Sequence, residues 1–195
     1  MKHKIGCVIL ASGKSERYGN NKLDIKIDGV SLIDRAISCI PKNSFSKVAV
    51  VSRFENVKEK TENRGFHYIE NNHPEYGISH TIKLGLNYTS DCDATLFMVS
   101  DQPLLKQESV VKMLEFFSKN SDFIVSMGYN GKKGNPCIFP KAFYDELFAL
   151  ENDNGGSAVI KYHEDKLKIF NIECKKELKD IDTKEDLEFL SETEV

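Results

Sequence analysis

The chain contains few cysteines, and their spacing matches no disulfide or metal-binding motif. The five cysteines are widely separated, and no CxxC pair occurs among the 195 residues. Neither a disulfide scaffold nor a zinc site is therefore indicated. A long apolar run is also missing, because the run at 5–11 is broken by Gly6 and followed by charges, which is too short for a signal or membrane segment. We expect a cytoplasmic protein with no membrane partner.

The chain also lacks an excess of positive charge. Its formal net charge is -3, whereas proteins that bind nucleic acids or membrane surfaces usually carry a basic excess. Any bound anion must then be held by a local group of cations, and no nucleic-acid partner is expected. No repeat, low-complexity stretch or linker interrupts the sequence, and the length suits one domain. We expect a single domain over 1–195.

Short apolar runs alternate with helix-like segments along the chain. Several of the runs are apolar without alternation, which is typical of strands covered on both faces. Strand–helix alternation predicts an α/β protein with a mostly parallel, doubly wound sheet, whose ligand-binding loops follow the carboxyl ends of the strands. The predicted strands are 5–11, 47–52, 66–70, 94–100, 122–128, 135–139 and 167–173, and the predicted helices are 32–40, 78–88, 107–119, 141–150, 157–163 and 184–192.

The first candidate site is LASGKSERYGNNK, 10–22, directly after the strand predicted at 5–11. Gly13 and Gly19 are expected to take positive φ and let the backbone approach a ligand, forming an anion-binding nest. The motif is neither a Walker A loop nor a GxGxxG loop, so a polar loop with solvated lysines is the alternative. Phosphate binding would use the hydroxyls of Ser12 and Ser15 and the cations Lys14, Arg17 and Lys22.

The second candidate is Asp101 in LFMVSDQPLL, 96–105, where an apolar strand leads into a carboxylate. The residue could be an ordinary helix cap or turn aspartate, or a magnesium ligand. Two unit charges 4 Å apart interact by about 1 kcal/mol in water and about 4 kcal/mol at a dielectric of 20. Because a helix terminus supplies only about half a charge, a divalent ion is the better means of holding several phosphates together.

The glycine loop resembles a known signature. Its spacing LAxGxSxRxGxxK is similar to that of the nucleotidyltransferase superfamily that includes the sugar-phosphate and molybdenum-cofactor nucleotidyltransferases. The resemblance implies a Rossmann-like nucleotidyltransferase fold in which loop 10–22 wraps the triphosphate and residues matching Arg17 and Lys22 contact the phosphates. The matching residues are Leu10, Ala11, Gly13, Ser15, Arg17, Gly19 and Lys22. Ser12, which stands where the family often has Ala, and Lys14 are also expected to bind the nucleotide, as a hydroxyl donor and a cation within the same loop.

The DQP sequence that begins at Asp101 resembles a subgroup of that superfamily. Members of the subgroup cytidylylate the molybdenum cofactor or assist the maturation of molybdenum hydroxylases, and Asp101 would be their Mg²⁺-binding aspartate. DIDTKEDL, 180–187, resembles the family ending DIDTxxDL and offers Asp182 as a second metal-side carboxylate, with Asp180 as its competitor. The same residues also suit a helix start, with Asp182 or Thr183 as the N-cap.

Three further segments resemble the family's substrate loops. In 70–86 the resemblance places Asn71, Gly77, Ser79 and Thr81 near the base and ribose, although helix capping alone would explain Ser79. The segments 131–139 and 150–160 resemble those that face the pterin acceptor, and turn or cap chemistry is their alternative. The residues assigned to the acceptor are Gln102, Pro103, Gly134, Asn135, Pro136, Asp153 and Gly155.

Two positions depart from the family pattern in these segments. Asn135 stands where histidine is common, and Ser157 stands where arginine is usual, which leaves the acceptor open. Lys132, Lys133 and Lys161 are the cations that could compensate. His73 and His80 are expected to be ordinary loop or surface histidines, because a phosphate nucleophile is already deprotonated near neutral pH and needs no general base.

The resemblance implies an Mg²⁺-dependent transfer of CMP from CTP to molybdopterin with release of pyrophosphate. Arg17, Lys22 and Asp101 would carry catalysis through positioning and electrostatics. The alternatives are another pair of substrates, such as GTP with molybdopterin or a nucleotide with a sugar phosphate. A non-catalytic maturation factor that delivers the cofactor to a molybdenum hydroxylase client is the alternative from a different class.

Overall fold

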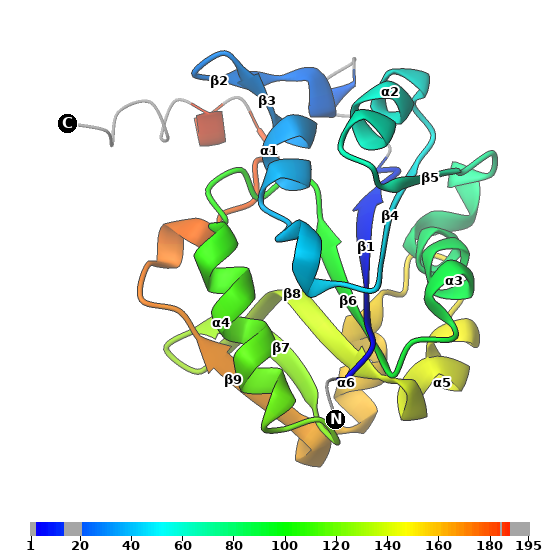
Figure 1. Cartoon of the computed structure of the whole chain (residues 1–195), viewed down its shortest axis with the longest axis vertical. Helices are drawn as coiled ribbons and strands as arrows, with labels where there is room; N and C mark the ends of the chain where they lie inside the picture. Colours follow the sequence, from blue (N-terminus) through cyan, green and yellow to red (C-terminus); the bar gives the residue numbers. More distant parts are fainter. Residues whose placement is uncertain (1–2, 14–20, 184, 188–195) are drawn as a thin grey trace.

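The computed structural model describes residues 3–13, 21–183 and 185–187, and within them a seven-stranded sheet forms the centre (Figure 1). The strand order across the sheet is β5-β4-β1-β6-β8-β7-β9. The strands are β1 Ile5–Ala11, β4 Lys47–Ser52, β5 His67–Glu70, β6 Ala94–Val99, β7 Ile124–Tyr129, β8 Lys132–Pro140 and β9 Leu167–Asn171.

The sheet is mostly parallel, as the alternation of strands and helices predicts. β1 pairs in parallel with β4 and β6, β4 with β5, and β7 with β9. β8 runs antiparallel to both of its neighbours, β6 and β7. The predicted α/β class and mostly parallel sheet are therefore confirmed, while the insertion of one reversed strand next to β6 is a feature of the structure alone.

Helices cover both faces of the sheet (Figure 1). The apolar residues of α1, α2 and α4 pack on one face, and those of α3, α5 and α6 pack on the other. The α-helices are α1 Leu32–Ser38, α2 Glu55–Asn63, α3 Gly77–Thr89, α4 Gln107–Ser118, α5 Tyr144–Phe148 and α6 Gly156–Tyr162. Short 3₁₀ turns lie at η2 Lys22–Asp24, η3 Lys42–Ser44, η4 Pro74–Tyr76, η5 Lys141–Phe143, η6 Glu164–Lys166 and η7 Lys175–Leu178.

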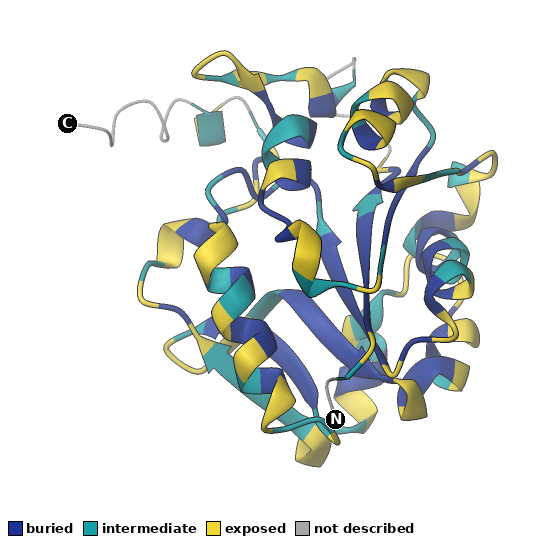
Figure 2. Ribbon diagram, viewed as in Figure 1, coloured by how far each residue is buried: buried dark blue, intermediate teal, exposed yellow. Residues whose placement is uncertain are grey.

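The central strands are buried on both faces, which explains why they lack alternation (Figure 2). Along β1, Cys7 and Ile9 belong to the core under α1 and α4, while Val8 belongs to the core under α3 and α5. Close packing reaches the backbone: a Cβ on Gly85 of α3 would lie 2.3 Å from a methyl of Val8. Glycine at this position lets α3 approach the strand closely.

Several predicted boundaries differ from the observed ones. The segment 141–150 forms η5 followed by α5, and α2 is a helix where none was predicted. A two-stranded hairpin, β2 Lys26–Ile27 and β3 Val30–Ser31, follows the glycine loop. The predicted helix 184–192 falls largely outside the described residues. In the described part of the chain, no helix combines the length and apolar character needed to cross a membrane.

Candidate active site at the carboxyl end of the sheet

β1 and β6 are neighbouring parallel strands, so the segments that follow them leave the same edge of the sheet. Their register pairs Leu10 with Val99. Beyond that pair, the hydroxyl of Ser100 donates to the carbonyl oxygen of Leu10 at 3.1 Å. The glycine loop and Asp101 therefore start side by side, as the sequence predicts.

The described start of the glycine loop is held by the neighbouring strand β4. The hydroxyl of Ser12 donates to the Val51 carbonyl at 3.2 Å, and the hydroxyl of Ser52 donates to the Ala11 carbonyl at 2.9 Å. Gly13 is exposed, and a Cβ built there would meet nothing within 4 Å. The expectation of positive φ is wrong for Gly13, which is not among the glycines with positive φ. Lys14, Ser15, Arg17 and Gly19 lie outside the described residues.

Lys22 ends the loop and lies between two carboxylates. It opens the 3₁₀ turn η2, where the Asn21 side chain accepts the Leu23 backbone N–H at 3.1 Å. The Lys22 Nζ lies 3.0 Å from Asp101 Oδ2 and 2.9 Å from Asp182 Oδ1. The residue is only 9% exposed. An ammonium at this depth needs such partners, since an unpaired buried charge is costly.

The two carboxylates keep Lys22 charged. Burial lowers the pKa of Lys22, but the charges of Asp101 and Asp182 and their hydrogen bonds outweigh burial, so the pKa is raised above its ordinary value. The side chain is therefore a fixed cation over the whole pH range in which enzymes work. A fixed cation at the edge of the sheet is suited to a phosphate or a developing negative charge.

Asp101 is neither a helix cap nor a simple turn residue. The helix that follows it, α4, begins at Gln107 with Lys106 as its N-cap, five residues beyond Asp101. One carboxylate oxygen, Oδ2, contacts Lys22, while Oδ1 is buried and has no hydrogen-bond partner among the described residues. A buried carboxylate oxygen without a partner is expensive. This atom is where a ligand or ion from outside the chain would be most strongly stabilised.

The segment after η7 brings a second carboxylate to the site from far along the sequence. The backbone N–H of Ile181 donates to the Asp101 carbonyl at 2.9 Å, which places the next residue, Asp182, beside Lys22. Capping here is performed by other residues, because the Asp186 carboxylate accepts the backbone N–H of Thr183 at 2.9 Å and the Thr183 hydroxyl accepts from the Asp186 N–H at 3.3 Å. The Asp182 carboxylate is thus directed to Lys22 and not to a cap.

Asp180 and Gln102 form a second contact between the same two segments. The Gln102 Nε2 donates to Asp180 Oδ1 at 2.9 Å and to the Leu178 carbonyl at 3.3 Å. Partial burial and the nearby charge of Asp101 raise the pKa of Asp180, against the effect of the Gln102 hydrogen bond. Gln102, assigned to the acceptor from the resemblance, instead faces the C-terminal segment, and Pro103 beside it is buried.

The carboxylates fit a magnesium ion that also binds phosphate. No group of three or more His, Cys, Asp or Glu side chains in the described residues is arranged to hold a metal alone. Mg²⁺ does not need such a group, because it usually binds one or two carboxylates together with phosphate oxygens and water. The partnerless Oδ1 of Asp101 and the exposed carboxylate of Asp182 supply that donor set. Asp101 and Asp182 are the residues that would hold the ion.

The predicted base and ribose loop is built around contacts within the chain. The Asn71 Nδ2 donates to the Thr81 hydroxyl at 3.1 Å, and both residues are buried. Gly77 has φ 79°, and a Cβ there would lie 2.4 Å from the Asn152 carbonyl oxygen and 2.6 Å from an Asp153 carboxylate oxygen. The Ser79 N–H donates to the same Asn152 carbonyl at 3.1 Å. α3 begins at Gly77 with Tyr76 as N-cap, so Ser79 is not the cap.

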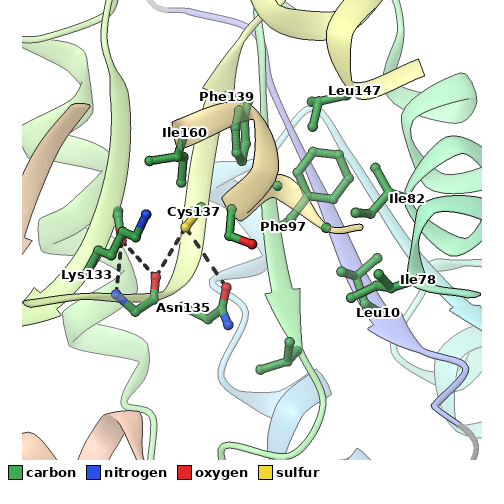
Figure 3. Close-up of a pocket in the computed structure, with 16 residues that line it drawn as sticks. Leu10, Ile78, Ile82, Phe97, Lys133, Asn135, Cys137, Phe139, Leu147 and Ile160 are labelled. Carbon is green, nitrogen blue, oxygen red and sulfur yellow. Dashed lines mark hydrogen bonds between the residues drawn. The ribbon is translucent and has the colours of Figure 1, made fainter. Parts of the chain in front are cut away.

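Those contacts bring the two predicted substrate loops together, and a cavity of about 280 Å³ lies beside them (Figure 3). The predicted acceptor residues Gly134, Asn135 and Gly155 line it, whereas Pro136 and Asp153 do not. Ser157, at the position of the usual arginine, lines it as well. The apolar part of the wall, which the sequence motifs do not reveal, is formed by Leu10, Ile78, Ile82, Phe97, Val99, Phe139, Leu147 and Ile160.

The wall of the cavity has a polar side and an apolar side (Figure 3). On the polar side, Gly134 donates its N–H to the Ser126 hydroxyl at 3.1 Å and accepts from it at 2.8 Å. The Cys137 thiol, whose pKa burial raises to about 11, donates to the Gly134 carbonyl at 3.2 Å. Among the described residues that line the cavity, Lys133 is the one with a charged side chain. The strand β8 thus presents a polar edge over an otherwise apolar hollow.

A family model described as the MobA-like NTP transferase domain matches residues 7–167. The match contains most of β1, the glycine loop, Asp101 and the residues that line the cavity. This chain belongs to the MobA-like NTP transferase family.

Relatives with assigned names agree with this family. A probable molybdenum cofactor guanylyltransferase of Aquifex aeolicus is 28% identical over 185 residues, covering 90% of the chain and 89% of the relative. A bifunctional protein GlmU of Clostridioides difficile is 24% identical over 143 residues. That alignment covers 71% of the chain but only 30% of GlmU, so the chain spans under a third of the longer relative.

Solved structures share the fold. Rv0371c of Mycobacterium tuberculosis superposes with a TM-score of 0.83 at 17% identity, covering 99% of this chain and 100% of that one. A manganese complex of the same protein gives 0.80 at 16% identity, with 97% and 99% coverage. The molybdopterin-guanine dinucleotide biosynthesis protein A of Archaeoglobus fulgidus gives 0.70 at 17% identity, with 96% of this chain and 97% of that one covered. The Rossmann-like nucleotidyltransferase fold is therefore shown.

Proposed function

We propose that this protein is a divalent-metal-dependent nucleotidyltransferase that transfers a nucleotidyl group, CMP from CTP, to the terminal phosphate of a molybdopterin-type acceptor and releases pyrophosphate. One observation carries the proposal. Lys22, at the end of the glycine loop, lies within 3.0 Å of carboxylates from two other segments, Asp101 and Asp182. A cation for phosphate and carboxylates for a metal are thus placed together at the edge where such sheets bind ligands.

The chain's own residues supply positioning and charge. The ammonium of Lys22 would leave the carboxylates and contact the phosphates that depart as pyrophosphate, stabilising the charge that develops there. Asp101 and Asp182 would hold Mg²⁺, which when bound draws the phosphates together and reduces their mutual repulsion. Arg17 would add a bidentate contact to phosphate oxygens. The acceptor phosphate is already ionised near neutral pH, so the chain need not provide a base.

The cavity under β8 is the proposed place for the organic part of the acceptor. Its apolar wall would cover a flat ring system, and the polar edge at Gly134 and Asn135 would orient it. Lys133 would provide the positive charge near the acceptor phosphate that Ser157 does not. Leu10 and Val99 line the cavity and are the last paired residues of β1 and β6, so the cavity adjoins the carboxylates.

The choice of nucleotide has one specific rival. CTP follows from the DQP sequence at Asp101, whereas the Aquifex relative is named a guanylyltransferase and aligns with 90% of the chain, which favours GTP as the second candidate. The likeness to GlmU supports a sugar phosphate acceptor less strongly, since it covers 30% of that protein. A non-catalytic carrier of the cofactor would need neither the cation nor the carboxylates at this edge.

A thermal-shift experiment tests the proposal directly. The protein is melted with CTP, GTP, ATP and UTP, each with and without Mg²⁺, and pyrophosphate release is then measured with molybdopterin. We expect stabilisation that requires both Mg²⁺ and one nucleotide, with CTP the most effective, and pyrophosphate release only when the acceptor is present. A response to no nucleotide would overturn the enzymatic proposal, and a preference for GTP would replace the donor while keeping the chemistry.

A further inference from the structure

Gln102 makes contacts that a substrate-binding residue would not need. It is 5% exposed, and both groups it faces through Nε2 are acceptors: the Asp180 carboxylate at 2.9 Å and the Leu178 carbonyl at 3.3 Å. Because both partners accept, the orientation of the amide is determined: rotating it by 180° would place an oxygen against two oxygens. The hydrogen bonds join residues 76 and 78 positions apart in the sequence.

The segment that Gln102 holds is the one that delivers Asp182. Leu178 and Asp180 lie shortly before Asp182 in the sequence. In the described residues, the segment is also tied to the end of β6 by the backbone hydrogen bond from Ile181 to Asp101 at 2.9 Å, and Ile181 is fully buried. The Asp182 carboxylate is more than half exposed, so it has little packing of its own to fix it. Its position therefore depends on its neighbours.

We propose that Gln102 is a positioning residue that fixes the second metal-side carboxylate, Asp182, by clamping the backbone before it through Asp180 and Leu178. The proposal rests on the metal-dependent function proposed above. It also gives Asp180 a role: Asp180 is an anchor for Gln102, and Asp182 is the carboxylate that faces the ion. Partners in the second layer around a metal typically change its affinity by about 10- to 100-fold.

The clamp leaves one atom of Gln102 available. Its Oε1 is buried and has no hydrogen-bond partner among the described residues, and the same is true of Oδ1 of the preceding residue, Asp101. Each of these two buried oxygens could accept a hydrogen bond from an ordered water molecule.

The test compares Mn²⁺ binding to the full chain, measured by the loss of the free-ion EPR signal, in four proteins. Gln102→Glu places a carboxylate against two acceptors and should weaken Mn²⁺ binding by about tenfold or more. Asp180→Asn keeps an accepting oxygen for Gln102 and should change it by less than about threefold. Gln107→Glu, the same chemical change at an exposed residue five positions on, should leave the affinity at the wild-type value.

A reciprocal double variant distinguishes loss of the Gln102–Asp180 hydrogen bond from a general disturbance of the fold. Combining Gln102→Glu with Asp180→Asn restores a donor facing an acceptor, so Mn²⁺ affinity should recover towards that of the wild type. Circular dichroism and the melting temperature verify folding in each protein. Unchanged Mn²⁺ binding in Gln102→Glu would overturn the proposal, as would loss of binding in Asp180→Asn equal to that in Asp101→Ala, which would make Asp180 a ligand. Absence of Mn²⁺ binding in the wild type would overturn it too.

Failure of the proposed function gives a different result. If the wild type binds Mn²⁺ and the Gln102 series behaves as expected, yet no nucleotide is transferred to molybdopterin, the clamp stands and the acceptor assignment fails. If transfer occurs with normal Mg²⁺ dependence in Gln102→Glu, the function stands and the clamp fails. In the active enzyme the clamp predicts a raised Mg²⁺ requirement at nearly unchanged KM for CTP.

Discussion

The edge of the sheet around Asp101 and the cavity beneath β8 are adjacent, but they differ in the chemical character of their side chains. The first consists of a buried lysine between carboxylates, and the second is mainly apolar with a polar rim. The first depends on segments that are 79 and 160 residues apart in the sequence. The difference indicates a division of labour, in which one region handles phosphate charge and metal and the other holds the organic part of the acceptor.

The largest expected effect comes from Asp101→Ala, which removes the central carboxylate. Nucleotide transfer should fall by about a thousandfold, equivalent to about 4 kcal/mol of transition-state stabilisation, while Mn²⁺ affinity also falls. Steady-state pyrophosphate release measures the change. Asp91→Ala is the control, because Asp91 also forms ion pairs with lysines, Lys4 and Lys47, but lies on the exposed surface. Near-normal turnover in Asp101→Ala would contradict the account.

Lys22→Met separates the phosphate cation from the metal carboxylates. Transfer should fall by about a hundredfold, as when one preorganised donor to a developing charge is lost. Mn²⁺ binding should persist or tighten, because Asp101 and Asp182 lose the cation that competes with the metal. The same change at Lys60, which pairs with Asp34 and Ser31 away from the site, should leave both properties intact. Loss of Mn²⁺ binding in Lys22→Met would mean that Lys22 does not compete with a metal.

A substitution in the cavity should affect the acceptor alone. Gly155→Leu points into the space beside Ile78, where a Cβ is tolerated at 3.7 Å. The KM for molybdopterin should rise about tenfold, within the range for a steric mismatch in a pocket, while the nucleotide-induced thermal shift remains. Gly155→Ala is the mild control and should bind the acceptor almost normally. Equal losses for nucleotide and acceptor would show that the two regions are not separate.

The smallest effect concerns the pH dependence of stability. Because the folded pKa of Asp180 is raised above its ordinary value of 3.8, its protonated form is the one the folded state favours. The stability that this gives is complete below the unfolded pKa and is lost as pH rises through the folded pKa. Asp180→Asn should therefore gain stability relative to the wild type between about pH 3 and pH 6. Urea unfolding at several pH values would reveal it, and an advantage of Asp180→Asn over the wild type that grows as the pH falls would contradict the direction of the shift.

The sequence predicts most of the fold because the central strands carry a strong signal. Uninterrupted apolar runs such as 94–99 can only be buried on both faces, and their alternation with helices sets the parallel order. α2 was missed because only Val57 and Thr61 of its residues are buried, which leaves too few apolar positions to reveal a helical period. The reversal of β8 is likewise absent from any local pattern, since it depends on pairing with β6 and β7.

The candidate site likewise has residues that local sequence motifs predict and residues that only long-range contacts bring together. Local motifs indicate Lys22 and Asp101. Lys22 is the last residue of the glycine loop, and Asp101 comes just after a buried strand, so both are expected at the carboxyl edge of the sheet. The pairing of Gln102 with Asp180 and the apolar wall of the cavity depend on contacts across the whole chain, which no local spacing encodes. The difference between Asp180 and Asp182 also appears only in the structure, where Gln102 contacts the former and Lys22 contacts the latter.

The central claim is that one metal–triphosphate complex binds between the glycine loop and Asp101. A crystal structure of the protein with CTP and Mn²⁺, with the metal located from its anomalous signal, tests this most directly. The account predicts a manganese peak in contact with Asp101 and with phosphate oxygens, and Lys22 moved from the carboxylates to the phosphates. A metal bound elsewhere, or a nucleotide with Lys22 still between Asp101 and Asp182, would contradict it.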